Sequence, residues 1–215
     1  MDSRFEEIAA ALVRGDAVAV RAGVTICLET GVEPTEIMAR GLIAGMGVIG
    51  HQFKNNEIYM PEVMIAARAM NAGLELLDPI LSRADGPCRA KMILGTVRGD
   101  LHDVGKNMVS MFFRGAGYEV VDLGVDVPEA RFVEAIREHR PRLVGLSALL
   151  STTVPQLSST VKALGEAGLR SGLVVMVGGA PVTQEYADSI GADGYAPDAA
   201  SAVDKAAELL AAVAW

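Results

Sequence analysis

The stretch that decides the fold is Gly99-Asp100-Leu101-His102-Asp103-Val104-Gly105-Lys106. It follows the apolar run 92–97, which predicts a buried strand of a parallel sheet. The run 107–113 after it predicts a helix. We therefore expect Asp100 and His102 in the loop at the carboxyl end of a strand, where open α/β sheets bind their ligands. Because His102 is one of only three histidines and is flanked by carboxylates and small residues, it is the first candidate for chemistry.

Beyond residue 88 the sequence alternates between strand and helix patterns. Strands are expected near 90–97, 118–123, 142–147, 173–178 and 193–196, and helices near 103–116, 128–139, 154–168, 182–190 and 199–213. Five βα units of this length predict an α/β domain with a doubly wound, Rossmann-like (flavodoxin-like) parallel sheet of five strands and right-handed crossovers.

Residues 1 to about 81 carry helical periodicity and no strand signal, and short connections divide them into four helices. They predict a four-helix bundle over residues 1–84, joined by the polar stretch 82–87 to a sheet domain over residues 88–215. The fourth helix has a methionine-rich stripe, in which Met60, Met64 and Met70 are expected mainly as core residues.

Composition excludes several classes of function. The 215-residue chain has a formal net charge of −8 and no basic stretch to neutralise phosphates, which argues against a nucleic-acid partner. Its acidic amino terminus is unlike a secretory signal, and it lacks the run of about 18 apolar residues that a membrane helix needs. Cys27 and Cys88 fit no zinc spacing, so we expect free thiols and a cytoplasmic protein.

Three further features fall at matching places in the predicted sheet. Ser147 and Leu149 end the third strand, Ser151 and Thr153 follow it, and Gly178-Gly179 ends the fourth strand. Each feature alone is compatible with ordinary turn chemistry, and a lone His102 with a helix cap. Together they line one edge of the sheet with glycines, hydroxyls and one imidazole. No cluster of His, Cys or Glu supplies a full metal cage, so a metal would have to arrive inside a cofactor that brings its other ligands.

At this edge the chain resembles a known family. Asp100-x-His102-x-x-Gly105, Ser147-x-Leu149 and Gly178-Gly179 are similar to the three linked signatures of cobalamin-binding domains of the methionine synthase type. The N-terminal half, in Gly47-Val48-Ile49-Gly50, Phe53 and Glu57-x-x-x-Pro61-Glu62, resembles the helical cap of small corrinoid proteins. Those proteins serve methanol, methylamine, betaine or methoxyaromatic methyltransferases.

The resemblance implies a role for each matching residue. His102 would be the axial ligand of the corrin cobalt, Asp100 would bond its other ring nitrogen, and Thr153 stands where the methionine synthase type has a serine. The implied cofactor contacts also include Gly99, Asp103, Gly105, Ser147, Leu149, Ser151, Gly178 and Gly179. Phe53, Met60 or Met64 would cover the upper corrin face, as the alternative to a core role. Lys106 is expected as an exposed helix lysine, with a phosphate contact as the alternative.

The function implied is that of a methyl carrier, which is itself a non-catalytic subunit of a methyltransferase system. Cobalamin or a related corrinoid would be the cofactor, with its methylated form as the intermediate. The implied partners are a substrate-specific methyltransferase, a second methyltransferase using tetrahydrofolate or a thiol as acceptor, and a reductive activation protein. Two alternatives stay open, a cobalamin-dependent sensor and a receiver-like signalling domain without a cofactor.

Overall fold

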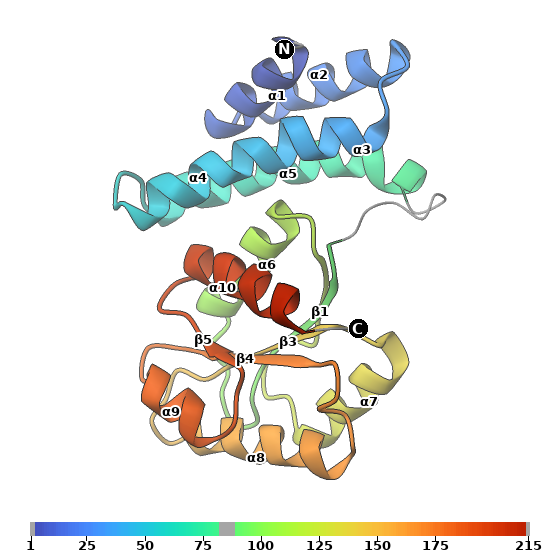
Figure 1. The fold of residues 1–215 in the computed structure, drawn as a ribbon. Coiled ribbons are helices and arrows are strands. Elements are labelled where there is room, and N and C mark those ends of the chain that lie inside the picture. The colour runs from blue at the N-terminus through green and yellow to red at the C-terminus, as the bar shows by residue number, and fades with distance from the viewer. Residues whose placement is uncertain (1–2, 82–88, 214–215) are drawn as a thin grey trace. The chain divides into compact units, whose positions relative to one another are not determined.

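The computed structural model describes residues 3–81 and 89–213. The chain divides into two compact units, one formed mainly by the helices up to residue 81 and one by the residues from 89 onward (Figure 1). The predicted linker 82–87, and with it the predicted boundary between residues 84 and 88, lies outside the described residues.

The first unit is built from four helical segments. They are α1 (Ser3–Val13), α2 (Ala17–Glu29), a continuous helix made of α3 (Pro34–Glu36), η1 (Ile37–Ile43) and α4 (Ala44–Lys54), and α5 (Met60–Leu81). The four predicted helices are thus confirmed, with Pro34 at the start of the third, where its missing N–H costs nothing. The π-helical turn η1 inside that helix was not predicted.

Side-chain burial in α5 corrects one prediction. Val63, Met70 and Leu77 are buried and form part of the core. Met64, by contrast, keeps 57% of its surface exposed, so its predicted core role is wrong. Two glycines of the third helix have a packing reason, because a Cβ on Gly41 or Gly45 would lie 3.0 Å from atoms of α1.

The second unit is a five-stranded parallel sheet with the order β2-β1-β3-β4-β5. Its strands are β1 (Lys91–Thr96), β2 (Glu119–Asp122), β3 (Leu143–Ser147), β4 (Val174–Gly178) and β5 (Gly194–Tyr195). Its helices are α6 (Val104–Gly115), α7 (Glu129–His139), α8 (Val154–Glu166), α9 (Gln184–Ser189) and α10 (Ala199–Ala212). This is the predicted flavodoxin-like order, and each predicted strand and helix is present.

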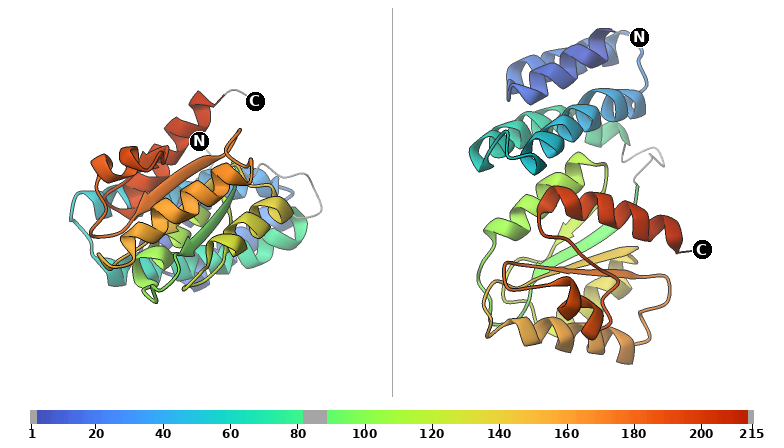
Figure 2. Two further views of the ribbon diagram at one scale, coloured as in Figure 1. Left: turned by 90° about the horizontal axis from the view of Figure 1, so that it is seen from below. Right: turned by 60° about the vertical axis from the view of Figure 1, so that its left-hand side comes forward.

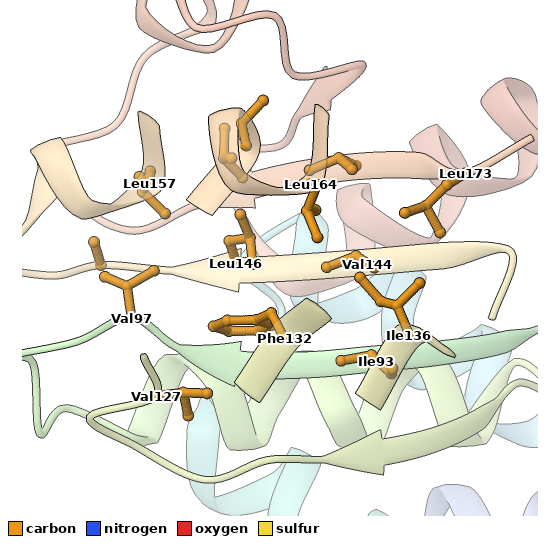
Figure 3. Packing of buried hydrophobic residues seen from close by; sticks show 14 of the residues in the cluster. Ile93, Val97, Val127, Phe132, Ile136, Val144, Leu146, Leu157, Leu164 and Leu173 are labelled. Carbon is orange, nitrogen blue, oxygen red and sulfur yellow. The ribbon is translucent and has the colours of Figure 1, made fainter. Parts of the chain in front are cut away.

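Helices cover both faces of the sheet. Figures 1 and 2 show α6 and α10 on one face and α7, α8 and α9 on the other. On the second face Phe132 and Ile136 of α7 pack against strand residues such as Ile93 and Val144 (Figure 3). Gly95 makes this packing possible, because a Cβ there would lie 2.8 Å from the ring of Phe132.

The position of the functional loop follows from the strand order. The connections after β1 and β3 leave for opposite faces, so the two strands, which are neighbours in the sheet, form the topological switch point. Open α/β sheets bind ligands in the crevice beyond the carboxyl ends of such strands. The loop after β1 carries Asp100 and His102, and the loop after β3 carries Leu149 to Thr153. Within residues 3–81 and 89–213, no helix combines the length and hydropathy needed to cross a bilayer.

Candidate functional site

Asp100 lies at the centre of the switch point and is completely buried. One carboxylate oxygen, Oδ1, accepts hydrogen bonds from the backbone N–H of His102 at 3.1 Å and from its ring Nδ1 at 2.7 Å. The other, Oδ2, accepts from the backbone N–H groups of Leu149 at 2.8 Å and Leu150 at 3.2 Å, and from the hydroxyl of Thr153 at 2.6 Å. The carboxylate therefore ties the loop after β1 to the loop after β3.

These hydrogen bonds decide the charge of Asp100. Burial by itself raises the pKa of a carboxyl group, because it disfavours the charged form. The hydrogen bonds from Thr153, from the backbone of Leu149 and from His102 outweigh burial and hold the pKa of Asp100 far below its ordinary value. Asp100 is accordingly an anion at neutral pH and can only accept hydrogen bonds.

The charge of Asp100 in turn fixes the tautomer of His102. Since the carboxylate can only accept, Nδ1 must carry the proton of the 2.7 Å hydrogen bond. In the neutral imidazole the lone pair then lies on Nε2. The side chain of His102 is 49% exposed, whereas that of Asp100 is not exposed at all. The pair thus presents a nitrogen donor held in place by a buried carboxylate, which is the arrangement that metal-ligating histidines use.

Thr153 completes this chain of hydrogen bonds. It is 6% exposed and precedes the first residue of α8, but its side chain makes no capping bond to that helix. Its hydroxyl lies 2.6 Å from Oδ2 of Asp100 and 2.9 Å from the carbonyl oxygen of Leu150, and we assign its hydrogen to the closer, charged acceptor. The three residues predicted to act together, His102, Asp100 and Thr153, are therefore joined in series in the structure.

The other predicted residues of the sheet edge fall into two groups. Ser147 and Gly178 are paired in register at the ends of β3 and β4, and both are partly exposed. A Cβ on Gly178 would meet no atom within 4 Å. Gly179, by contrast, has a φ of +132°, and a Cβ there would lie 1.8 Å from the carbonyl oxygen of Ala148. Gly179 is thus required by the backbone itself, whereas Gly178 borders open space.

The remaining predicted contacts are more dispersed. Ser151 and Gly105 are exposed, and Leu149 is 41% exposed although its N–H is bound to Asp100. Asp103 accepts a hydrogen bond from the side chain of Asn107 at 3.1 Å. Gly99 takes a left-handed φ of +79°, which suits glycine.

Met60 and Met64 belong to the first unit. Met60 is half-buried there, and Met64 is exposed. Their contact with a cofactor stays a prediction.

Two features of the site were missed in the sequence. Lys106 is not an exposed helix lysine, because its Nζ donates to Asp122 at the end of β2 and to Asn107. Thr96 is fully buried and donates its hydroxyl hydrogen to the carbonyl oxygen of His102 at 2.9 Å. A polar residue at the end of the apolar run 92–97 was the available signal for Thr96. The backbone donors of Leu149 and Leu150 leave no signal in side-chain identity.

Among residues 3–81 and 89–213, the site offers one imidazole, that of His102, as a nitrogen donor. Over residues 3–81 and 89–213, no group of three or more His, Cys, Asp or Glu side chains is placed to hold a metal ion. A metal bound by His102 therefore needs its other ligands from a cofactor. The loops that carry the site also expose apolar side chains beside the polar Asp103 and Ser151: Leu101, Val104, Leu149 and Leu150 keep 71%, 66%, 41% and 42% of their surfaces exposed. Fold and site together define a class of protein that receives a metal-containing cofactor at the edge of a Rossmann-like sheet.

Comparison with known proteins gives the family. The model of one B12 binding domain family matches residues 90–204, and that of a second matches residues 4–78. Dimethylamine corrinoid protein 1 of Methanosarcina acetivorans is 44% identical over 208 residues, which are 96% of this chain and 97% of that protein. The dimethylamine corrinoid protein of Methanosarcina barkeri is 47% identical over 180 residues, 83% of this chain and 84% of that protein.

A solved structure agrees. A chain of the methanol:cobalamin methyltransferase complex from Methanosarcina barkeri aligns with a TM-score of 0.88 and 31% identity, over 98% of this chain and 81% of that one. This chain belongs to the B12-binding family of corrinoid proteins, and a cobalamin or related corrinoid is its cofactor. The predicted family, fold class and cofactor are thereby confirmed. The same result decides against the receiver-like alternative without a cofactor.

Proposed function

We propose that the protein carries methyl groups between two methyltransferases, with a methylated amine as the first donor to test. The relatives that support this donor are dimethylamine corrinoid proteins, which are 44% and 47% identical to this chain. The structural relative in a methanol:cobalamin methyltransferase complex supports a substrate-specific methyltransferase as partner. A second methyltransferase would pass the methyl group to a thiol or to tetrahydrofolate, and a reductive activation protein would restore the cofactor after oxidation.

The observation that carries the proposal is the Asp100–His102 pair. Its geometry leaves Nε2 of His102 as an outward-facing lone pair while Nδ1–H stays bonded to a buried anion. When bound, the corrinoid supplies a cobalt that accepts a methyl group from one partner and releases it to another. The chain's own task is to offer or withdraw one nitrogen below that metal. We propose that His102 is this axial ligand.

The pair can also hold a proton. When Nε2 is released, His102 can take up a proton there while Nδ1–H stays on Asp100, giving an imidazolium next to a buried carboxylate. Thr153 keeps its hydroxyl hydrogen on the far oxygen of the same carboxylate. The three residues would thus couple a proton to the presence or absence of the axial ligand.

The surrounding residues would bind and shield the cofactor. We propose that the exposed apolar side chains around His102 contact the corrinoid and exclude water from the ligand nitrogen. The remaining proposed contacts are those predicted from the sequence: Gly99, Asp103, Gly105, Ser147, Leu149, Ser151, Gly178 and Gly179. Among these, Gly178 has the open space that a bulky cofactor group would need.

The proposal is tested by following a labelled methyl group. The purified protein is loaded with cobalamin, reduced, and incubated with a dimethylamine-specific methyltransferase and ¹³C-dimethylamine. We expect monomethylamine and a ¹³C-methyl signal on the protein-bound corrinoid in equal amounts. Labelling from ¹³C-methanol with its own methyltransferase instead would correct the donor. No labelling from either donor, together with a preference for adenosylcobalamin, would reject the carrier role in favour of the sensor alternative.

A further inference from the structure

The loop that carries Asp100 and His102 lies against the loop that follows β2. Backbone hydrogen bonds join the two, from Thr96 N–H to the carbonyl oxygen of Gly124 and from Val127 N–H to that of Thr96, each at 3.0 Å. Val97 and Val127 also form an isolated parallel bridge. The loop after β2 therefore stays hydrogen-bonded to the end of β1, next to the residues that begin the site loop.

Asp126, in this second loop, has an unusual backbone conformation. Its φ is +53°, in the left-handed region that residues other than glycine seldom adopt. The surrounding contacts hold it there. Its side-chain Oδ1 accepts a hydrogen bond from the N–H of Gly99 at 2.6 Å, and its own N–H donates to the carbonyl oxygen of Asp100 at 2.9 Å.

These two hydrogen bonds hold the backbone on both sides of Asp100. The N–H of Gly99 precedes Asp100 in the chain and the carbonyl group of Asp100 follows its Cα, so these bonds restrain the backbone on either side of Asp100. The N–H of Asp100 is held separately by the carbonyl oxygen of Val97 at 3.1 Å. Farther along, the carbonyl of His102 is held separately by the hydroxyl of Thr96. Asp126 thus restrains the backbone from which Asp100 projects its carboxylate toward His102.

We infer that Asp126 is a positioning residue for the axial ligand: by fixing the backbone around Asp100, it orients the carboxylate that orients His102. This inference rests on the proposed ligation of cobalt by His102. Asp126 itself touches neither the ring of His102 nor its Nε2 in the described hydrogen bonds. Its side chain is exposed, so its replacement should leave the core of the second unit intact.

Three variants separate the acceptor oxygen of Asp126 from its left-handed backbone conformation. Asp126→Asn keeps an acceptor oxygen and tolerates a left-handed φ, whereas Asp126→Gly keeps only the backbone freedom. Asp126→Ala loses both. Arg140→Gly is the matched control, because Arg140 is another exposed residue with a positive φ, +46°, at the end of α7 and outside the site loops.

Two measurements are made on each variant. In the cofactor-free protein, ¹⁵N NMR of the histidine ring reports whether Nδ1 of His102 keeps its hydrogen-bonded proton. In the protein saturated with cobalt(II) cobalamin, electron paramagnetic resonance reports the ratio of histidine-ligated to unligated cobalt. We expect Asp126→Gly to lower this ratio about tenfold, the effect of losing one charge-assisted hydrogen bond, and to speed exchange of the Nδ1 proton. Asp126→Asn should stay within about threefold of wild type, since it retains the acceptor.

The control Arg140→Gly should change neither measurement. Equal ratios and equal proton exchange in wild type and Asp126→Gly would overturn the inference. If wild-type protein shows no histidine ligation, the proposed function fails instead, and the exchange of the Nδ1 proton still decides whether Asp126 positions His102.

Discussion

Replacing Thr153 by valine removes the shortest of the five hydrogen bonds on the Asp100 carboxylate while nearly preserving the volume of the side chain. The change removes no helix cap, because the hydroxyl of Thr153 makes no capping bond to α8. A hydrogen bond to a charged group contributes about 1.5–3 kcal/mol. Since Asp100 is completely buried, we expect Thr153→Val to lower the free energy of unfolding of the second unit by about that amount at pH 7.

The same change should raise the pKa of Asp100. The bond from the Thr153 hydroxyl is the strongest of the hydrogen bonds that lower the pKa of Asp100, so its loss should move this pKa upward, toward the ordinary value of an aspartate. A depressed pKa stabilises the fold above the unfolded value of about 3.9, and this stabilisation is lost as the pH falls below it. Because the folded pKa of the variant is closer to the unfolded value, its stability should depend less steeply on pH in the acid range.

Urea unfolding, followed through backbone amide signals of the second unit, gives the free energy, and ¹³C NMR of the carboxyl group gives the pKa. Thr153→Ser should behave like wild type. Thr160→Val is the matched control, since the buried hydroxyl of Thr160 bonds only to the neutral carbonyl of Gln156 at 2.8 Å. It should cost about 0.5–1.5 kcal/mol and leave the pKa of Asp100 unchanged. If Thr153→Val changes neither quantity by more than this control does, the hydrogen-bonded chain of the site is misassigned.

Two further predictions use matched pairs of positions. Gly178→Leu should fold normally and lose corrinoid occupancy, because a side chain there enters open space, whereas Gly179→Ala should destabilise the fold itself. Occupancy is measured by the corrinoid absorbance of the purified protein, and full occupancy in folded Gly178→Leu would count against a cofactor group at this edge. Met70→Ala should lower the free energy of unfolding of the first unit by about 2–5 kcal/mol, because Met70 is buried, and Met64→Ala by less than about 0.5 kcal/mol. Similar losses for both variants in thermal unfolding would show that Met64 packs as a core residue.

The sequence predicted those parts of the structure that depend on local patterns. Alternating apolar runs and helical periodicity located the five strands and the helices between them, and parallel topology then placed the ends of β1, β3 and β4 at one edge. The π-helical turn at Ile37–Ile43 could not be predicted, because it depends on how that helix packs rather than on a residue preference. The exposure of Met64 was missed for a related reason, since a helical stripe does not show how wide the buried face is.

At the site, the sequence context singled out Asp100 and His102, and the family resemblance added Thr153, but neither indicated the groups that hold them. The backbone donors of Leu149 and Leu150 leave no trace in residue type. Asp126 was not singled out in the sequence, and only the three-dimensional contact between two loops reveals its bonds to the backbone around Asp100. The ion pair of Lys106 with Asp122 joins residues 16 positions apart and was likewise invisible in the local pattern.

The most direct test of the account is the identity of the nitrogen below the cobalt. Electron paramagnetic resonance of the cobalt(II) form is recorded with the protein grown on natural and on ¹⁵N-labelled histidine. We predict that the superhyperfine splitting changes from the three-line pattern of ¹⁴N to the two-line pattern of ¹⁵N. The ¹⁵N two-line pattern should disappear in His102→Ala, which should still fold because the ring of His102 is half exposed and belongs to a loop; a ¹⁴N three-line pattern in that variant would come from the cofactor's own lower base. A pattern that is unchanged by labelling would mean that the ligand is not a histidine, and a ¹⁵N two-line pattern that persists in labelled His102→Ala would mean that the ligand is another histidine.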